Sequence, residues 1–420
     1  MKSTNENTIN QIQSPPAGTN NAGQHTARPT PPPIWFLALC TANAVVGLTI
    51  LTPALPMIKT ELGVSSAAVQ QLLTVYMVAL AVGQLVYGPL SDRIGRRPIM
   101  LTGAVLYTAG CLLATFTNSI EHLTLLRIAQ GLGAAACMSM GRAIVNDAFE
   151  RNEAARQMST ISIMLAIAPV LSLAFGGILA ESTGWKGIMT LLTATSLAMT
   201  IAAFHMAVET NTNRLSVINV KSVLQAYSTV LRNRLFLCWA VSSGMQVGIF
   251  FSLNGFLAYQ YQRHGYSLAE FGLWFALTPL CYLIGNSCNR KWFVARGIER
   301  AAMTGCTLSL VSVISLYITQ ALGFTHALSL ALPCCLFGFS NGIVIANATV
   351  GAISTAGKHA GTGTGIVGAW QMATGGIAGA IIVFLGGAKE FSIAASTLIS
   401  MSAISVFCMW RVYRQRNLQQ

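Results

Sequence analysis

Long apolar stretches separated by short polar segments recur along nearly the whole chain. Each holds roughly 20 residues, the length at which an α-helix crosses a hydrocarbon layer about 30 Å thick. Lipid offers the backbone no hydrogen-bond partner, so such stretches must be helical. The pattern therefore predicts twelve membrane-spanning helices, near residues 34–55, 67–88, 99–117, 122–144, 156–180, 186–207, 234–258, 269–288, 298–319, 327–349, 364–386 and 391–410.

The longest internal polar stretch falls between the sixth and seventh predicted helices, near the middle of the chain. Two halves that bind a solute at their interface are a known plan for membrane transporters. We predict an all-α integral membrane fold of two pseudo-symmetric six-helix bundles. The predicted segments are a disordered cytoplasmic tail (1–33), an N-terminal bundle (34–207), a cytoplasmic linker (208–233), a C-terminal bundle (234–410) and a cytoplasmic tail (411–420).

Composition agrees with a membrane protein. Hydrophobic residues make up 53% of the chain and charged residues 9%, with a mean hydropathy of +0.59, whereas soluble chains carry about 25% charged residues. The ten cysteines lie in or beside apolar stretches, so we expect small buried or lipid-facing residues there. The sequence has no catalytic constellation, metal-ligand spacing or phosphate loop, so we expect neither an enzyme nor a bound metal or cofactor.

The net charge of +13 follows a topological pattern. Most Lys and Arg residues fall in the tails and in the loops on one side of the predicted helices, whereas the other side holds only Lys59, Lys186, Arg263 and Lys389. This asymmetry obeys the positive-inside rule and puts both termini in the cytoplasm. It argues against a nucleic-acid surface. Residues 1–33 lack the apolar core of a removable signal peptide, so we expect a multi-pass protein of the bacterial inner membrane.

The most specific motif is GPLSDRIGRR at residues 88–97. Its glycines would permit a tight turn, its arginines would stay at headgroup level, and its aspartate could pair with an arginine or cap a helix. We predict a gate that holds the inner face shut until a carboxylate is protonated. The alternative, a basic loop set only by topology, explains the arginines but not the Gly-Pro-Leu-Ser-Asp order. The predicted gate residues are Gly88, Asp92, Arg93, Gly95, Arg96 and Arg97.

This loop resembles the signature of the major facilitator superfamily, and further segments are similar to its Bcr/CflA drug-resistance branch of twelve-helix drug:proton antiporters. The resemblance runs from about residue 35 to 410. It implies proton-linked export of drugs or of an endogenous metabolite. The segments that carry it are LRIAQGLGAA (126–135), RAIVND (142–147), EAARQMS (153–159), YSLAEFG (266–272) and AGTGTG (360–365).

Two arginines lie inside the fourth predicted helix. Arg127 is about six residues into the span, where a charge is costly and normally faces a cavity or a partner. The resemblance implies that Arg127 takes part in proton coupling, and the alternative is snorkelling to the headgroups. Arg142 lies near the inner interface, where snorkelling is nearly as good an explanation. Asp147 is predicted to pair, at a helix end, with an arginine of the loop.

Other polar residues inside spans are candidates for a solute cavity, or equally for hydrogen bonds between packed helices. We expect the fifth span to bend at Pro169, Gly176 and Gly177. The cavity candidates, besides Arg127, Arg142 and Asp147, are Asn43, Thr49, Gln130, Gln246, Asn254, Asn341, Asn347, Trp370 and Gln371.

The chain departs from the branch at two places. Thr49 stands where helix one of the branch carries an aspartate, shortly before a Pro-Ala-Leu-Pro sequence, and Ser172-Leu173 stands where its exporters carry a Gly/Ala-Pro pair. No acidic residue lies at mid-membrane in the predicted topology. An intramembrane arginine such as Arg127 would favour an anionic solute. These two departures leave open whether transport is coupled to protons and whether the solute moves inward or outward.

The expected partners are a small-molecule solute, with an anion favoured, a proton as coupling ion, and the lipid bilayer, but no nucleic acid. We expect a monomer. The specialised alternative to drug export is transport of a metabolite such as a carboxylate-type siderophore, outward or inward. The alternative of another class is a non-transporting receptor or sensor that keeps the carrier fold, which the departures from the family motifs would support.

Overall fold

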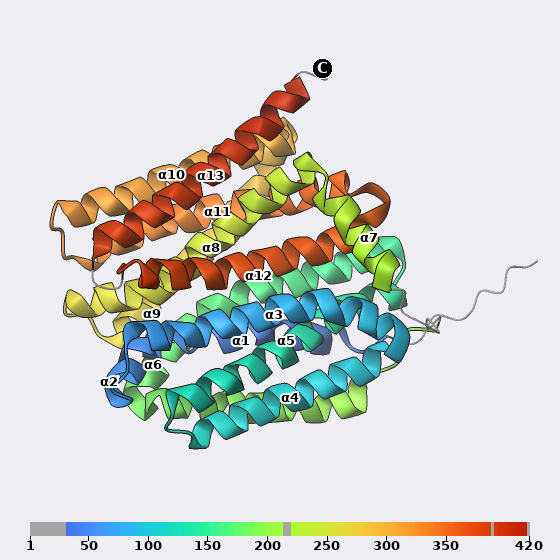
Figure 1. Cartoon of the computed structure of the whole chain (residues 1–420), viewed down its shortest axis with the longest axis horizontal. Helices are drawn as coiled ribbons and strands as arrows, with labels where there is room; N and C mark the ends of the chain where they lie inside the picture. Colours follow the sequence, from blue (N-terminus) through green and yellow to red (C-terminus); the bar gives the residue numbers. More distant parts are fainter. Residues whose placement is uncertain (1–30, 213–219, 388–389, 418–420) are drawn as a thin grey trace, which may run out of the picture.

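The computed structural model describes residues 31–212, 220–387 and 390–417. Throughout these ranges the chain is helical, without strands, and the long helices run roughly along one axis (Figure 1). The predicted all-α membrane fold is therefore confirmed. Most of the predicted N-terminal tail and part of the predicted linker lie outside the described residues.

The N-terminal half contains six α-helices and a 3-10 turn. These are α1 (Ile34–Thr49), η1 (Thr52–Ala54), α2 (Leu55–Glu61), α3 (Ser66–Ile94), α4 (Arg96–Phe116), α5 (Ile120–Ala148) and α6 (Arg151–Met206). The remaining helices follow from residue 220. These are α7 (Val220–Leu231), α8 (Arg234–Arg263), α9 (Leu268–Cys288), η2 (Asn289–Phe293), η3 (Val294–Arg296), α10 (Ile298–Ala321), α11 (Ala327–Thr355), η4 (Gly357–His359), α12 (Ala360–Phe384) and α13 (Phe391–Asn417).

The described chain has 11 helical segments long and apolar enough to cross a membrane, and one of them, Arg156–Met206, has 51 residues. That is more than twice the roughly 20 residues that one crossing needs. Its backbone leaves the helical region at Gly184, where φ is 72°. Glycine adopts this left-handed conformation at no steric cost. The long helix α6 therefore crosses twice, which gives the twelve predicted crossings.

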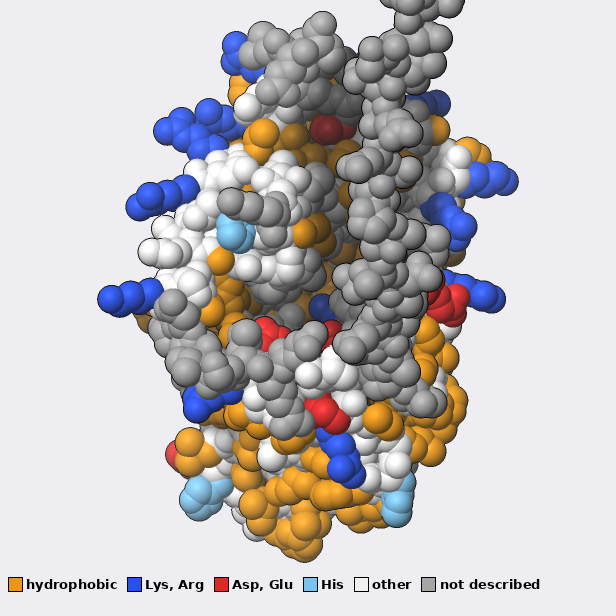
Figure 2. Space-filling model, turned by 90° about the vertical axis from the view of Figure 1, so that its right-hand side faces the viewer, with side chains coloured by type: hydrophobic (Ala, Val, Ile, Leu, Met, Phe, Trp, Pro, Cys, Tyr) orange, Lys and Arg blue, Asp and Glu red, His pale blue; other side chains and the backbone are white. Residues whose placement is uncertain are grey.

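Successive crossings alternate between two ends of the bundle. We call them the Gly184 end and the Gly95 end, after two of the turns. Left-handed glycines lie in turns at the Gly184 end (Gly63, Gly184, Gly265, Gly323, Gly386) and at the Gly95 end (Gly95, Gly297, Gly357). Lys and Arg side chains gather around the rim of the Gly95 end, which faces the viewer in Figure 2.

The two halves pack through α3 against α12 and through α6 against α9 (Figure 1). Their contact is very close toward the Gly184 end. A Cβ atom on Gly177 would lie 2.5 Å from the carbonyl oxygen of Leu268. The Thr74 hydroxyl donates to the Gly376 carbonyl at 3.1 Å. Small residues that let backbones approach are a common basis of helix association in membranes.

The linker region contains a helix that the sequence pattern did not predict. In α7, Val230 is buried and the Tyr227 hydroxyl donates a 3.0 Å hydrogen bond to the carbonyl oxygen of Leu85 in α3. The segment was interpreted as a plain linker because residues 208–233 form the longest internal polar stretch of the chain. Helices α3 and α13 also continue beyond the predicted spans, to Ile94 and Asn417.

Candidate functional site

A cavity of about 270 Å³ lies between the two halves. Its walls come from the middle of the helices and from their portions toward the Gly95 end, since Arg142 is close to the end of α5 and Ser162 close to the start of α6. The lining residues are Val45, Met138, Arg142, Ser162, Leu165, Ala166, Pro169, Val247, Phe250, Phe251, Thr278, Pro279, Tyr282, Gly338, Asn341, Ile345, Gln371 and Met372.

Charge in this cavity comes from a single residue of the described lining, Arg142 of α5. Within the described ranges, its guanidinium has neither an ion-pair partner nor a hydrogen-bond acceptor. Two other lining groups, the amide oxygen of Asn341 and the hydroxyl of Thr278, are buried and have no described partner. Buried polar groups normally have partners. This cavity therefore presents a cation and two hydrogen-bonding groups that are free to bind a solute.

The rest of the lining is mainly apolar. Phe250 and Phe251 meet edge to face with 5.1 Å between ring centroids. Met138 and Met372 supply flexible thioether side chains that adapt to different shapes. The Gln371 amide is already engaged, since it donates to the Ser243 hydroxyl at 2.5 Å. An apolar pocket with a few polar groups is typical of small-molecule sites.

Arg127 lies elsewhere, inside the N-terminal half. It is fully buried, donates to the carbonyl oxygens of Gly47 (2.9 Å) and Leu72 (3.2 Å), and its guanidinium carbon lies 4.2 Å from the centre of the Tyr76 ring. Its other acceptor is the Gln130 amide oxygen at 2.8 Å.

Arg127 therefore does not line the cavity between the halves, and its implied part in proton coupling stays a prediction. Gly47 lies in the last turn of α1, where carbonyl groups lack helical partners and a cation is favourable. The arginine therefore stabilises the end of α1. The Gln130 amide also belongs to this packing, since it donates to the Gly110 carbonyl at 3.0 Å.

Most of the other cavity candidates bind neighbouring helices instead of lining the cavity. The Thr49 hydroxyl is buried against Ser172, and Gln246 belongs to a buried network with Ser309 and Ser405. Asn347 donates to Asn289 at 2.8 Å. The remaining four candidates also lie outside the lining. Asn43 lines a much smaller cavity inside the N-terminal half, Trp370 is 40% exposed, Asn254 is buried without a described partner, and Asp147 is paired at a helix end. Of the candidates, Arg142, Asn341 and Gln371 line the cavity.

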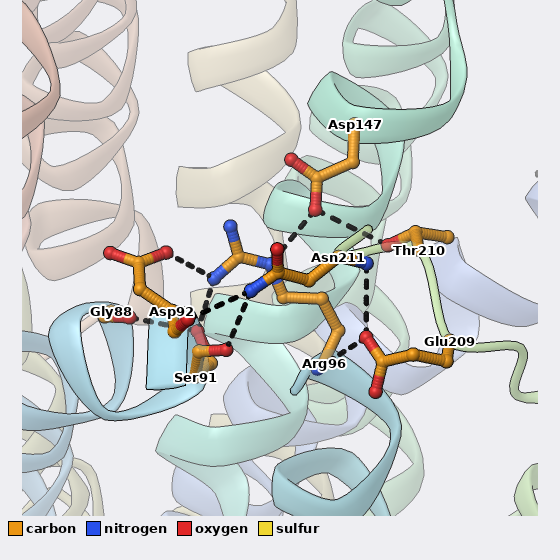
Figure 3. A network of polar contacts seen from close by, with 8 residues as sticks. All are labelled: Gly88, Ser91, Asp92, Arg96, Asp147, Glu209, Thr210 and Asn211. Atoms are coloured by element: carbon orange, nitrogen blue, oxygen red, sulfur yellow. Dashed lines mark hydrogen bonds and ion pairs between the residues drawn. The ribbon is translucent and has the colours of Figure 1, made fainter. Parts of the chain in front are cut away.

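A polar network surrounds Arg96 at the Gly95 end (Figure 3). Its guanidinium pairs with Asp92 at 2.7 Å and with Asp147 at 2.8 Å, and it also contacts the Ser91 hydroxyl. The backbone nitrogen of Arg96 donates to the Glu209 carboxylate at 2.9 Å. The predicted pairing of Asp147 with a loop arginine is thus confirmed.

The segment after α6 completes this network. Thr210 donates to the Asp147 carboxylate at 3.2 Å, and the Asn211 amide donates to the Asp92 carbonyl at 3.0 Å (Figure 3). The network therefore connects α3, α4, α5 and the chain after α6, all within the N-terminal half. The sequence did not predict the part of Glu209 and Asn211, which were assigned to the linker.

The local structure of the motif differs from a loop. Helix α3 continues through Gly88 and Asp92 to Ile94, and within the motif the turn is made at Gly95 alone, with φ of 113°. Arg93 and Arg97 are exposed, and Arg97 donates to the Phe204 carbonyl at 3.3 Å. Arg96 is therefore the arginine that holds the network.

The bending of the fifth span at Pro169, Gly176 and Gly177 stays a prediction, because a helix can bend at a proline while its φ and ψ angles remain helical. Within the described part of α6, the backbone leaves the helical region at Gly184, not at Pro169, Gly176 or Gly177. Pro169 lines the cavity. Gly176 faces the Ile50 carbonyl and Gly177 faces Leu268, where an added Cβ would clash. These two glycines serve close packing.

The Major Facilitator Superfamily model matches residues 37–413. The chain is 26% identical over 386 residues to the bicyclomycin resistance protein homolog of Haemophilus influenzae, covering 89% of this chain and 94% of that protein. It is 28% identical over 324 residues to the chloramphenicol resistance protein of Pseudomonas aeruginosa, covering 77% of each. It is 25% identical over 380 residues to multidrug resistance protein D of Escherichia coli, covering 89% of this chain and 94% of that protein.

Among solved structures, the fold is similar to a bacterial homolog of the human lysosomal transporter Spinster, described as inward-facing and unoccupied. The TM-score is 0.68 with 13% identity, covering 90% of this chain and 94% of that one. At this identity the likeness concerns the fold. The family match, by contrast, covers nearly the whole chain. The chain therefore belongs to the Major Facilitator Superfamily and is a multi-pass membrane transporter, not an enzyme.

Proposed function

We propose that the protein is a secondary active transporter that moves a small organic solute by alternating access of its two halves. The observation that carries this proposal is the cavity between the halves, lined from both of them. Toward the Gly184 end the halves touch through Gly177, Leu268, Thr74 and Gly376. The solute would enter from the Gly95 end and leave after the contacts at the other end open.

The Gly95 end is assigned to the cytoplasm, with both termini on that side of the bacterial inner membrane. The support is the concentration of Lys and Arg at this end (Figure 2), as the positive-inside rule requires. With this orientation the structure is an inward-facing state. The protein would function as a monomer, because the cavity is built within one chain.

The proposed direction is export of a drug or an endogenous metabolite. It is supported by relatives named for resistance to bicyclomycin, chloramphenicol and multiple drugs. The lone cation in the cavity favours an anionic solute. A carboxylate-type siderophore, carried in either direction, is the second candidate on the same ground.

Proton linkage is proposed through the Arg96 network. The described cavity lining holds no Asp or Glu, whereas Asp92, Asp147 and Glu209 meet around one arginine at the Gly95 end. Protonation of a carboxylate there would weaken its pairing with Arg96 and release α3 from α4 and α5. We place the proton-sensitive step at this network, with Arg96 as its centre. Because the network lies within the N-terminal half and is formed in this inward-facing state, it would control the packing of α3 on α4 and α5 and would not itself hold the inner face shut.

The test uses everted membrane vesicles that hold an imposed pH gradient, reported by a pH-sensitive dye. Chloramphenicol, bicyclomycin and a carboxylate-type siderophore are added in turn. A proton-linked carrier dissipates the gradient on addition of its solute, and vesicles with an inactive variant do not respond. Solute flux that ignores the gradient contradicts the proton linkage. Saturable binding without flux in proteoliposomes would instead favour the receptor alternative.

A further inference from the structure

The unoccupied polar groups of the cavity come from different halves of the protein. Arg142 belongs to α5 in the N-terminal half, whereas Thr278 belongs to α9 and Asn341 to α11 in the C-terminal half. Each half therefore contributes a different recognition group. A solute that uses all of them must bridge the two halves.

The chemistry of these groups defines what they bind. A guanidinium donates in a planar fork that matches a carboxylate. The Asn341 amide oxygen lacks a donor, and the Thr278 hydroxyl can donate or accept. Thr278 is 1% exposed and Asn341 6%, so neither satisfies its hydrogen bonds at the protein surface. The rings of Phe250 and Phe251 line the same cavity and suit an apolar or aromatic body.

We infer that the transported solute is an amphipathic hydroxy acid: a carboxylate that binds Arg142, an apolar or aromatic body, and a hydroxyl or N–H group that binds Asn341 and Thr278. This inference rests on the proposed function, since it names the solute class of the same cavity. It also adds a mechanism. The carboxylate is the group of the solute that binds the N-terminal half, through Arg142. The second polar group binds the C-terminal half, through Asn341 and Thr278.

The bridging has a consequence for transport. A ligand shifts a conformational equilibrium only by the difference of its affinity between the states. A solute with both groups draws the halves together around the cavity and favours closure of the Gly95 end. An acid without the second group occupies the cavity without that bias, so it inhibits transport and is itself carried poorly.

The binding test uses five small probes of similar size on the purified full-length protein. These are 4-hydroxyphenylacetate with its 2- and 3-hydroxy isomers, phenylacetate, which lacks the hydroxyl group, and tyramine, which inverts the charge. Thermal unfolding is measured against probe concentration to give each Kd. At least one hydroxy isomer is expected to bind about tenfold more tightly than phenylacetate. Tyramine is expected to give no shift. Equal stabilisation by tyramine, or no shift with any carboxylate, overturns the inference.

Three substitutions assign the groups. Arg142→Gln is expected to abolish the shift with every acid, whereas Asn341→Leu and Thr278→Val reduce the affinity for the hydroxy acid to that for phenylacetate and leave phenylacetate unaffected. Because phenylacetate lacks the hydroxyl group, comparing each variant with the two kinds of acid isolates the contact made by that hydroxyl group. Each variant is first compared with the wild type in its solute-free unfolding temperature, which separates lost binding from lost folding. Wild-type affinity in Arg142→Gln overturns the inference.

A flux measurement separates this inference from the carrier proposal. Proteoliposomes are expected to exchange the hydroxy acid, while phenylacetate only inhibits that exchange. If the probes bind in the expected order but none is exchanged, the site stands and the carrier proposal fails. If chloramphenicol is exchanged equally by the wild type and Arg142→Gln, the carrier proposal stands and the hydroxy-acid inference fails.

Discussion

The hydroxyl oxygens of Thr49 and Ser172 lie 2.5 Å apart, both buried between α1 and α6. Thr49 also reaches the Val45 carbonyl at 2.8 Å, and Ser172 the Pro169 carbonyl at 3.3 Å. The two positions at which the chain departs from the drug-resistance branch are thus in direct contact. Two neutral hydroxyls satisfy each other where that branch carries an acid. A titratable group is therefore absent from this contact.

A carboxylate restored at this contact should change coupling. Thr49→Asp places a titratable group beside Ser172, so solute flux should depend more steeply on the imposed pH gradient than in the wild type. Flux is measured in everted vesicles at several gradients, with Thr49→Val as the control that removes the hydroxyl without adding an acid. An unchanged dependence in Thr49→Asp would show that this position has no part in coupling.

Arg127 and Arg142 should respond differently to substitution. Arg127→Met removes the donor to the Gly47 carbonyl at the end of α1, and a buried acceptor left without a partner costs about 1–3 kcal/mol. Its unfolding temperature in detergent should fall. Arg142→Gln, which breaks no described hydrogen bond, should unfold near the wild-type temperature. The opposite order would contradict the assignment of a structural role to Arg127.

Removing one charge from the Arg96 network should stop transport but leave the protein in the membrane. Asp92→Asn weakens a pair in which Asp92 is 44% exposed, so the stability loss should not exceed about 1 kcal/mol. Transport and the amount of protein in the membrane are measured together. Glu390→Gln, which removes one negative charge at an exposed position just before α13, is the charge-matched control. Full activity in Asp92→Asn would remove the Arg96 network from the mechanism.

The close contact at the Gly184 end should resist even one added methyl group. In Gly177→Ala the new Cβ meets the Leu268 carbonyl, so the first turn of α9 should move away and exchange its amide hydrogens faster. Hydrogen exchange of peptides covering residues 264–274 measures this. Gly365→Ala is the control, because an added Cβ there meets no atom within 4 Å. Equal exchange in both variants would contradict a tightly sealed Gly184 end.

The hydrophobic pattern was sufficient to predict the membrane-spanning helices, because a long apolar stretch in lipid must be helical to satisfy its backbone hydrogen bonds. It could not reveal which face of a helix meets the other half. Arg127 and Arg142 lie on one helix, 15 residues apart, and only the packing decides that one caps α1 while the other faces the cavity. Sequence position pointed to Arg127, whereas the arginine in the cavity lining is Arg142. Position along a span gives the depth of a side chain but not the face of the helix on which it lies.

The gate motif shows the same limit. The order of residues 88–97 indicated a specific structure, and the pairing of Asp147 with an arginine followed from their shared end of the bundle. The part played by Glu209 and Asn211 depends on how the chain folds back after α6, which no local pattern encodes. The helix α7 was missed because its apolar and polar residues are mixed within a stretch that was interpreted as polar, although seven of its twelve residues are apolar.

The central claim is that solute crosses the membrane through the cavity that contains Arg142. The most direct measurement is the exchange of the labelled hydroxyphenylacetate isomer that binds most tightly, across proteoliposomes that contain the wild type or Arg142→Gln in equal, folded amounts. The account predicts saturable exchange by the wild type and none above the empty-liposome rate by the variant. Equal exchange by the two proteins, or binding by the wild type without exchange, would contradict it.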